Sequence, residues 1–235
     1  MLLRLLLLAA ALIAFDSGSP SVALAQDDSS FPPVYRPGLR IRTPEWGSEA
    51  SRDQRGEAEK VMDWLSIRTG DRVAHIRAGR GYYTLRLARR LGQTGILYAE
   101  DENPGYLAEL RGRLEREGFP FVLVVQGEGG DPRLPPGSVD IAILDHRYHE
   151  IENPYEFFYR LFPSLAPGAR LGIIEEERPT DHEGTPAALL RCELGALGYR
   201  ETQFTFLTPS TAYLAIFVAP EALPPVSQIR ACGAE

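Results

Sequence analysis

The sequence predicts one α/β domain with a mostly parallel sheet that ends in an antiparallel hairpin. Segments of strand type alternate with segments of helix type from about residue 50 onward. The strand-type segments are almost continuously apolar, which is typical of parallel strands covered on both faces by helices. The last two of them follow each other with only a short link, which favours a hairpin.

The overall composition is that of an ordinary globular protein. The 235 residues are 44% hydrophobic and carry a formal net charge of −7. Such a chain is long enough to bury one sizeable core. A net acidic protein is poorly suited to follow a phosphate backbone, so we expect no nucleic-acid partner.

The first residues have the pattern of a secretory signal peptide. Residues 2–15 are almost wholly apolar apart from Arg4, and the sequence Ala23-Leu24-Ala25 follows. A basic residue, a short apolar run and an A-x-A site are typical of such peptides, and the run is shorter than the roughly 20 residues of a membrane span. We therefore predict a signal peptide over residues 1–25 and an exported protein, periplasmic or secreted, without a stable membrane span after cleavage. An uncleaved anchor or a misassigned start codon is the alternative.

Helical and strand-like patterns begin only after a second N-terminal segment. Residues 26–48 are rich in Pro, Ser and Asp and show no periodicity, so we interpret them as an extended arm. The α/β domain then covers residues 49–220, and residues 221–235 form a C-terminal tail. No internal repeat is present.

The elements of the domain follow from their apolar spacing. Ala58, Val61, Met62 and Leu65 recur at helical spacing, which predicts a helix within residues 49–68. Apolar runs predict strands at residues 72–76, 95–99, 121–125, 139–144, 170–174, 202–207 and 212–218. Amphipathic patterns predict helices at residues 82–91, 104–117, 154–165 and 186–197. Turn residues separate the elements at 134–137 and 166–168, and residues 208–210 link the hairpin.

The stretch HIRAGRGYYT, residues 75–84, lies where such a domain carries its ligand loop. In open α/β sheets the ligand lies beyond the carboxyl ends of the strands, and glycines let the backbone approach it. Gly79 and Gly81 are present, and Asp101 closes the next strand 20 residues after Gly81, where a carboxylate holds ribose hydroxyls. Thr84 occupies the place of the third glycine of the dinucleotide fingerprint, which counts against NAD.

Four stretches together resemble the class I S-adenosylmethionine-dependent methyltransferases. They are RAGRGYYTLRLARRLG, ILYAEDENP, GDPRLPPGSVDIAILDHRYHEIENP and LFPSLAPGARLGIIE. The resemblance covers roughly residues 50–219. It implies a Rossmann-like class I methyltransferase fold, with a seven-stranded sheet ending in an antiparallel hairpin, and S-adenosylmethionine as the cofactor.

The resemblance also assigns roles to individual positions. It implies that the cofactor is held by Gly79, Gly81, Tyr82, Asp101, Asp131 and Asp145. Asp131 would lie beside the adenine, and Asp145 would border the methionine end and the methyl acceptor. His149 would act near the acceptor as a general base or, with Tyr148, shape the pocket wall. The acceptor would be an unidentified small molecule or protein.

Two positions depart from the family pattern. His75 stands in place of the loop's carboxylate, and Arg77 stands in place of its first glycine. An unpaired arginine there would repel the sulfonium of the cofactor. S-adenosylmethionine is also made in the cytoplasm, so an exported enzyme has no obvious supply. The alternative is a non-catalytic binding protein in which His75 and Arg77 line the former pocket and attract an anionic ligand or a partner.

Other polar clusters have an ordinary interpretation beside a functional one. Polar residues beyond the fourth and fifth strands form either a metal site or a polar rim with no fixed metal, and we favour the polar rim. A metal there would orient an acceptor hydroxyl or serve a hydrolase-like activity. The residues of this rim are Asp145, His146, His149, Glu150, Glu175, Glu176, Glu177, Asp181 and His182. Five arginines form either a basic patch for an anion or, as we favour, a solvated helix face. They are Arg77, Arg80, Arg86, Arg89 and Arg90.

Two cysteines and an aromatic helix complete the candidates. Cys192 and Cys232 either pair in an oxidising compartment or remain thiols, with Cys192 a buried helix position. The aromatic residues of residues 154–165 are interpreted as core and flank positions rather than a substrate platform. They are Phe157, Phe158, Tyr159 and Phe162.

Overall fold

The structure, a computed structural model, describes residues 30–36, 48–207 and 211–233. The predicted signal peptide, most of the predicted arm and the hairpin link at 208–210 lie outside the described residues. Within the described ranges, no helix is both long enough and apolar enough to cross a membrane.

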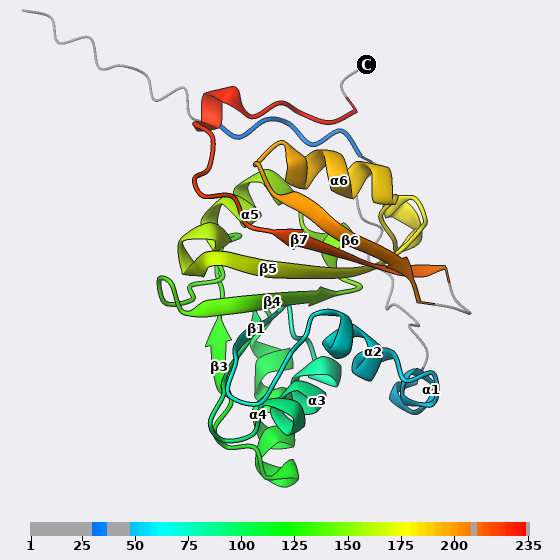
Figure 1. Ribbon diagram of the computed structural model, residues 1–235, viewed down its shortest axis with the longest axis vertical. Helices are drawn as coiled ribbons and strands as arrows, with labels where there is room; N and C mark the ends of the chain where they lie inside the picture. Colours follow the sequence, from blue (N-terminus) through cyan, green and yellow to red (C-terminus); the bar gives the residue numbers. More distant parts are fainter. Residues whose placement is uncertain (1–29, 37–47, 208–210, 234–235) are drawn as a thin grey trace, which may run out of the picture.

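The centre of the domain is a seven-stranded sheet in the order β3-β2-β1-β4-β5-β7-β6 (Figure 1). The strands are β1 Arg72–Ile76, β2 Ile96–Asp101, β3 Leu123–Gln126, β4 Val139–Asp145, β5 Leu165–Glu176, β6 Arg200–Phe206 and β7 Ala212–Val218. β1 to β5 pair in parallel, whereas β7 pairs antiparallel with both β5 and β6. The predicted fold class, including the antiparallel end of the sheet, is therefore confirmed.

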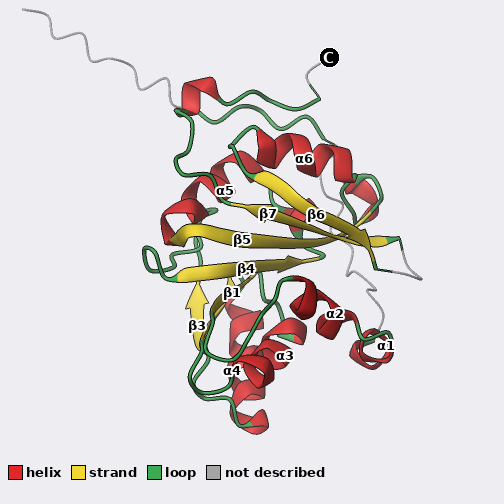
Figure 2. Ribbon diagram, viewed as in Figure 1, coloured by secondary structure: helices red, strands yellow, loops and turns green. Residues whose placement is uncertain are grey.

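Helices cover both faces of the sheet and give three layers (Figure 2). They are α1 Glu49–Gln54, α2 Glu57–Trp64, α3 Tyr82–Leu91, α4 Pro104–Glu117, α5 Pro154–Leu161 and α6 Ala187–Gly195. α2, α3 and α4 pack on one face in a core that includes Val61, Leu87 and Ile141. α5 and α6 pack on the other face, in a core that includes Phe158 and Leu190.

Three of the differences in extent between predicted and observed elements have a clear physical cause. The helix predicted within residues 49–68 is two helices, because Gly56 takes the left-handed conformation, with φ of 62°, between α1 and α2. The helix predicted at 154–165 ends at Leu161 and continues as a 3₁₀ turn, since Pro163 has no N–H to donate. The turn predicted at 166–168 lies within β5, where the pairing with β4 shifts its register and Gly168 has φ of 74°.

The order in which successive strands are added to the sheet switches between β1 and β4. From β1 the chain proceeds outward through β2 and β3, then returns to β4 on the other side of β1. In open α/β sheets the ligand binds at such a switch point, so the expected site lies at the carboxyl edge between the loops after β1 and β4, and we call this place the crevice. This is the edge at which residues 75–81 and Asp145 lie.

The described part of the arm lies beside the C-terminal tail over α5 and α6 (Figure 1). The rings of Phe31 and Tyr159 meet edge to face with centroids 5.3 Å apart. Cys192 of α6 and Cys232 of the tail form a disulfide across 40 residues of sequence. Of the two alternatives open from sequence, pairing is the one that the structure contains.

Candidate cofactor site

The glycine-containing loop is closed by its own backbone. Arg77, Gly79 and Gly81 all have positive φ, at 51°, 54° and 89°. The N–H of Ala78 donates to the carbonyl of Glu100 at 2.7 Å, and the N–H of Gly81 donates back to the carbonyl of Ala78 at 2.9 Å. The loop is thus held across the end of β2 and leads directly into α3.

The two glycines serve different purposes. A Cβ on Gly81 would lie 2.4 Å from Cδ1 of Leu110, so this glycine permits α4 to pack against the loop. A Cβ on Gly79 would meet only the guanidinium of Arg147, at 3.5 Å. Gly79 therefore faces the crevice, and Gly81 faces the core.

Asp101 lies directly under the loop. Its Oδ2 accepts the N–H of Gly79 at 2.9 Å, and its Oδ1 accepts the N–H of Asn103 at 2.8 Å. The side chain is almost wholly buried, but each carboxylate oxygen can accept a second hydrogen bond. The structure thus brings together Gly79, Gly81 and Asp101, as a ribose-binding arrangement requires.

His75 lies beneath the loop instead of lining the crevice. It is 1% exposed, its Nε2 lies 2.6 Å from Oδ1 of Asp145, and its Nδ1 lies 2.7 Å from Oγ1 of Thr84. We assign Nε2–H as the donor to Asp145 and Nδ1 as the acceptor of the Thr84 hydroxyl. The hypothesis that His75 attracts an anionic ligand in the pocket is wrong on this point, because both ring nitrogens are used and the ring is buried.

Arg52 of α1 completes this buried network. Its guanidinium lies 3.2 Å from Oδ2 of Asp145 and 2.6 Å from Oε1 of Glu57. Burial would raise the pKa of Asp145, but the hydrogen bond from His75 and the nearby positive charges hold that pKa below its ordinary value. Burial is likewise outweighed at Glu57, where the hydrogen bonds from His146 and Arg52 lower the pKa to about 2.

Tyr82 faces this network and not the loop. Its ring lies between two guanidinium groups, with Cζ of Arg52 at 3.7 Å and Cζ of Arg86 at 3.8 Å from its centroid. Its hydroxyl donates to Asp53 at 3.1 Å. Tyr82 therefore fastens α1 to α3, and a direct role in cofactor binding stays a prediction.

Arg77 lies over the loop on the crevice side. Its guanidinium lies 3.4 Å from Oε2 of Glu102 and 5.6 Å from the ring centroid of Phe157. The adjoining cavity, of about 260 Å³, contains more carboxylates than cations. Its lining includes Arg77, Glu102, Glu150, Glu152, Glu156 and Phe157. The side chain of Arg77 is thus paired and turned toward β2 and α5.

Glu100 lies behind the loop as a buried carboxyl group. Its Oε2 accepts the N–H of Arg77 at 3.2 Å, while Oε1 has no hydrogen-bond partner. Burial raises its pKa to about 8, against the hydrogen bond from Arg77. A Cβ on Gly127 would lie 2.2 Å from Oε1, so this glycine makes room for the carboxyl group. Glu100 is therefore protonated at neutral pH.

The residues predicted on the acceptor side lie in a 3₁₀ turn, Tyr148–Glu150, after β4. Nδ1 of His149 lies 2.8 Å from Oε2 of Glu175, and both side chains are buried. The hydroxyl of Tyr148 donates to Glu193 at 2.8 Å on the α6 side of the sheet. His149 thus faces β5 at the crevice edge, whereas Tyr148 is fully buried behind it and does not line the crevice.

Asp131 lies in the loop after β3, where the backbone N–H of the neighbouring Gly127 donates to the carbonyl of Asp101 at 3.2 Å. It forms an isolated bridge with Glu128, and its Oδ1 accepts the N–H of Arg133 at 2.8 Å. It lines a separate open cavity with Tyr159 and Leu223. A contact with adenine stays a prediction that this arrangement does not itself support.

The carboxylate and imidazole rim does not assemble as a metal centre. Among the residues that the structure describes, no group of three or more His, Cys, Asp and Glu side chains could hold a metal ion. His149 pairs with Glu175, whereas His182 pairs with Asp181 on the surface.

The five arginines do not gather as a free basic patch. Each has a carboxylate partner, and the partners come from four different parts of the domain. The pairs are Arg77 with Glu102, Arg80 with Glu109, Arg86 with Asp53, Arg89 with Glu117, and Arg90 with Glu59 and Asp63. The arginines are therefore paired, and only the side chains of Arg80 and Arg89 are more than half exposed, so a solvated face describes these two alone.

Sequence reasoning missed four residues of the site: Arg52, Glu57, Thr84 as a hydrogen-bonding residue, and Glu102. A charged residue that interrupts a helical pattern, as Arg52 does, is a weak signal of a buried ion pair. The partners themselves come from separate segments, so only the fold reveals them.

A glycine loop over a strand-end carboxylate, at the switch point of a parallel sheet, is typical of nucleotide-binding α/β proteins. A protein-family model described as a methyltransferase domain matches residues 75–173. The chain is 26% identical over 125 residues to a 2-phytyl-1,4-naphtoquinone methyltransferase of Nostoc punctiforme, covering 52% of this chain and 54% of the relative. It is 27% identical over 122 residues to the ubiquinone/menaquinone biosynthesis C-methyltransferase UbiE of Azotobacter vinelandii, covering 52% and 48%.

Solved structures show the same fold. A SAM-dependent methyltransferase from Aquifex aeolicus superposes with a TM-score of 0.68 at 22% identity, over 72% of this chain and 93% of that one. The [4+2]-cyclase SpnF superposes with a TM-score of 0.65 at 15% identity, over 80% and 88%. The family model, the curated relatives and the fold of the solved structures all support the resemblance to the class I S-adenosylmethionine-dependent methyltransferases. The chain spans about half the length of the curated relatives it matches.

Proposed function

We propose that this protein binds S-adenosylmethionine at the loop formed by residues 77–81 and transfers its methyl group to an acceptor at the crevice. The observation that carries the proposal is the contact between Gly79 and Asp101, in which a left-handed glycine donates its N–H to the strand-end carboxylate. A carboxylate at the end of the second strand, close to the glycine loop, supports ribose binding, because such folds hold ribose hydroxyls there.

The residues present fit the ribose end of the cofactor, whereas the residues near its methionine end differ from the family pattern. Asp101 would accept the ribose hydroxyls, and a ligand close to the backbone of Gly79 would lie beside the guanidinium of Arg147. When bound, S-adenosylmethionine supplies an electrophilic methyl group on a sulfonium. Asp145 remains ionised beside Arg52 and contributes negative charge at the edge where that cation would lie.

The chain's own residues would orient the acceptor and handle its proton. His149 is held by Glu175 in one orientation, with its backbone N–H and Nδ1 both directed at the carboxylate. An imidazole held in this way by a carboxylate is suited to accept a proton, as a general base does. Methyl transfer depends mainly on alignment and exclusion of water, so His149 would assist the reaction rather than enable it.

The acceptor class to test first is a reduced naphthoquinone ring. Two relatives have names that refer to a naphthoquinone or to ubiquinone and menaquinone biosynthesis, although both are matched over about half their length. A protein acceptor is the second choice.

A non-catalytic binding protein is the second candidate function. The observation that favours it is Arg77, whose guanidinium bridges to Glu102 and lies over Phe157 beside the loop. If this pairing persists in the presence of ligand, the crevice keeps a side chain where the family has only a glycine. The pocket would then take a different ligand.

We also propose that the protein is exported. The pattern of residues 1–25 supports export, and so does the Cys192–Cys232 disulfide, since disulfides persist mainly in oxidising compartments. Export raises the question of cofactor supply, and the binding of S-adenosylmethionine is therefore the first point to establish.

The experiment is a transfer assay with methyl-labelled S-adenosylmethionine and a reduced naphthoquinone, analysed by mass spectrometry of the products. Native protein should give labelled product, and Asp101→Asn should lose most of that activity. Asp140→Asn is the matched control, because Asp140 pairs with Arg72 away from the loop. Binding of S-adenosylmethionine without transfer to any acceptor tested would favour the second candidate.

A further inference from the structure

The arm and the tail together enclose a buried ion pair behind the candidate site. Arg36 of the arm lies 3.5 Å from Glu193 of α6, and their side chains are 5% and 2% exposed. A buried arginine of this kind is stabilising only when its remaining donors are satisfied. Its second terminal nitrogen donates to the backbone carbonyl of Ile151, and its Cζ lies 5.5 Å from the ring centroid of Tyr148.

These contacts join the arm to the segment that carries His149. Tyr148 is the first residue of the turn Tyr148–Glu150, and Ile151 directly follows the turn. The hydroxyl of Tyr148 donates to the same Glu193 that Arg36 contacts. The turn is therefore fixed from two sides. Glu175 holds His149 on the crevice side, and Arg36 with Glu193 holds Tyr148 and Ile151 on the other.

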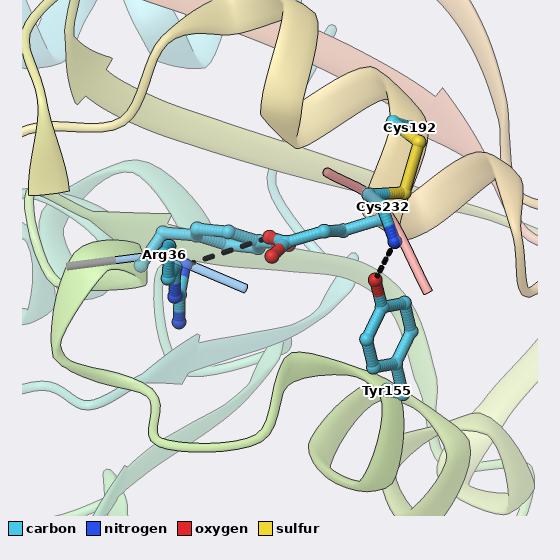
Figure 3. The surroundings of a disulfide bond; sticks show 6 residues. Arg36, Tyr155, Cys192 and Cys232 are labelled. Atoms are coloured by element: carbon cyan, nitrogen blue, oxygen red, sulfur yellow. Dashed lines mark hydrogen bonds and ion pairs between the residues drawn. A yellow bond between two sulfur atoms is a disulfide. The ribbon is translucent and has the colours of Figure 1, made fainter. Parts of the chain in front are cut away.

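The disulfide fixes the element that carries Glu193. Cys192 is the neighbour of Glu193 on α6, and it is joined to Cys232 of the tail (Figure 3). The backbone N–H of Cys232 donates to the hydroxyl of Tyr155 at 2.8 Å, which ties the tail to α5. Gly233 also lies close to the arm, since a Cβ there would be 3.2 Å from the carbonyl oxygen of Tyr35. Arm, tail, α5 and α6 thus form one clasp, defined by Arg36, Tyr155, Glu193 and the disulfide.

We propose that Arg36 is a positioning residue for the turn Tyr148–Glu150, and that the Cys192–Cys232 disulfide holds it in place, so that ligand binding at the crevice depends on the redox state of the clasp. Neither Arg36 nor the disulfide touches the proposed cofactor loop. The effect passes through Tyr148 and Ile151 to His149. The part of the inference that concerns ligand binding rests on the proposed function, whereas the ordering of the turn does not.

The redox step is an ordinary thiol–disulfide exchange with a dithiol reductant. Cys192 is exposed and Cys232 is buried, so a thiolate would attack the sulfur of Cys192. The bond between the two cysteines breaks, Cys232 leaves as a thiolate and takes up a proton, and a mixed disulfide forms at Cys192. The second thiol of the reductant then displaces Cys192, leaving two protein thiols and an oxidised reductant.

The test measures the turn directly by hydrogen exchange of the amides of residues 148–151. Four proteins are compared: native chain, Cys192→Ser with Cys232→Ser, Arg36→Met, and Arg36→Lys, which keeps the charge. The control is Arg72→Met, which removes a half-exposed arginine at the other end of β1. We expect exchange in the turn to accelerate by about fivefold or more in the cysteine variant and in Arg36→Met, with partial recovery in Arg36→Lys and no change in the control.

A second readout is the dissociation constant of S-adenosylhomocysteine, which should rise about threefold to thirtyfold in the same two variants. Treating native protein with a dithiol should reproduce the cysteine variant, which keeps the test valid if that variant folds poorly. Faster exchange confined to the tail, with residues 148–151 unchanged, would overturn the proposal. If the native chain does not bind S-adenosylhomocysteine at all, the proposed function fails, and the exchange data alone decide whether the clasp positions the turn.

Discussion

Nε2 of His75 lies 2.6 Å from Oδ1 of Asp145, and both side chains lie at the carboxyl edge of the sheet on adjacent parallel strands. The other ring nitrogen of His75 contacts Thr84, which occupies the place of the third glycine in a dinucleotide loop. His75 and Thr84 are therefore parts of one hydrogen-bonded arrangement with Asp145. Asp145 supplies a carboxylate beside position 75, and His75 and Arg52 hold it in its ionised form.

Restoring an acid at position 75 should therefore harm the protein. His75→Asp removes both hydrogen bonds of the imidazole and places a second carboxylate beside Asp145 in a buried site. We expect the free energy of unfolding to fall by about 3 kcal/mol at pH 7, because one buried carboxylate would lack a partner. Urea unfolding followed by circular dichroism measures this.

A double variant that keeps a single carboxylate in the site is the control for that prediction. His75→Asp with Asp145→Asn leaves one carboxylate in the site, so it should regain a substantial part of the lost stability. A single variant as stable as the native protein would show that the contact between His75 and Asp145 contributes nothing.

Gly81→Ala and Gly79→Ala should differ clearly. At Gly81 the new methyl group would lie 2.4 Å from Leu110 on a left-handed backbone, so we expect a loss of about 2–4 kcal/mol. At Gly79 only the backbone preference opposes alanine, and the expected loss is about 1 kcal/mol. Thermal unfolding of both variants checks the difference. Equal losses would contradict the separate roles of the two glycines.

Glu100 should make the protein less stable as the pH rises. Its pKa is about 8 in the folded protein, against an ordinary value of 4.5, so the folded state holds more protons than the unfolded state between these pH values. The unfolding free energy must then fall across that window, by about 2–4 kcal/mol for a group buried to this degree. Glu100→Gln keeps an acceptor for the N–H of Arg77 and should remove that decline, so that it exceeds native stability above pH 8.

Glu57 should make the protein more stable as the pH rises, the opposite of the effect of Glu100. Its pKa is lowered to about 2 from 4.5, so it stabilises the fold above pH 4.5 and loses that contribution as the pH falls toward 2. Urea unfolding between pH 2 and 9 distinguishes the two groups. A flat profile above pH 5 in the native protein would contradict the buried, protonated state of Glu100.

Much of the fold was predictable because its signals are local. Apolar runs located every strand, and the helix at Pro104–Glu117 was predicted with its observed bounds, since Asn103 caps it and Pro104 opens it. Gly56 and Pro163 are visible in the sequence, yet periodicity on both sides of each concealed the breaks that they cause.

The site was less predictable than the fold because its contacts are long-range. Gly79, Gly81 and Asp101 could be found by spacing along one β-α-β segment. Arg52 and Asp145 are 93 residues apart in the sequence, and Arg36 and Glu193 are 157 apart. Such charge pairs have no spacing rule, and their partners become neighbours only when the sheet is assembled.

The most direct test of the account is a calorimetric titration of the purified chain with S-adenosylhomocysteine, with Asp101→Asn and Arg77→Gly titrated in parallel. The account predicts micromolar binding by the native chain, loss of about tenfold or more in Asp101→Asn, and binding at least as tight in Arg77→Gly, because glycine suits the left-handed backbone and removes the charge. Native protein that fails to bind while Arg77→Gly binds would contradict a working cofactor site and would leave a pocket closed by one arginine.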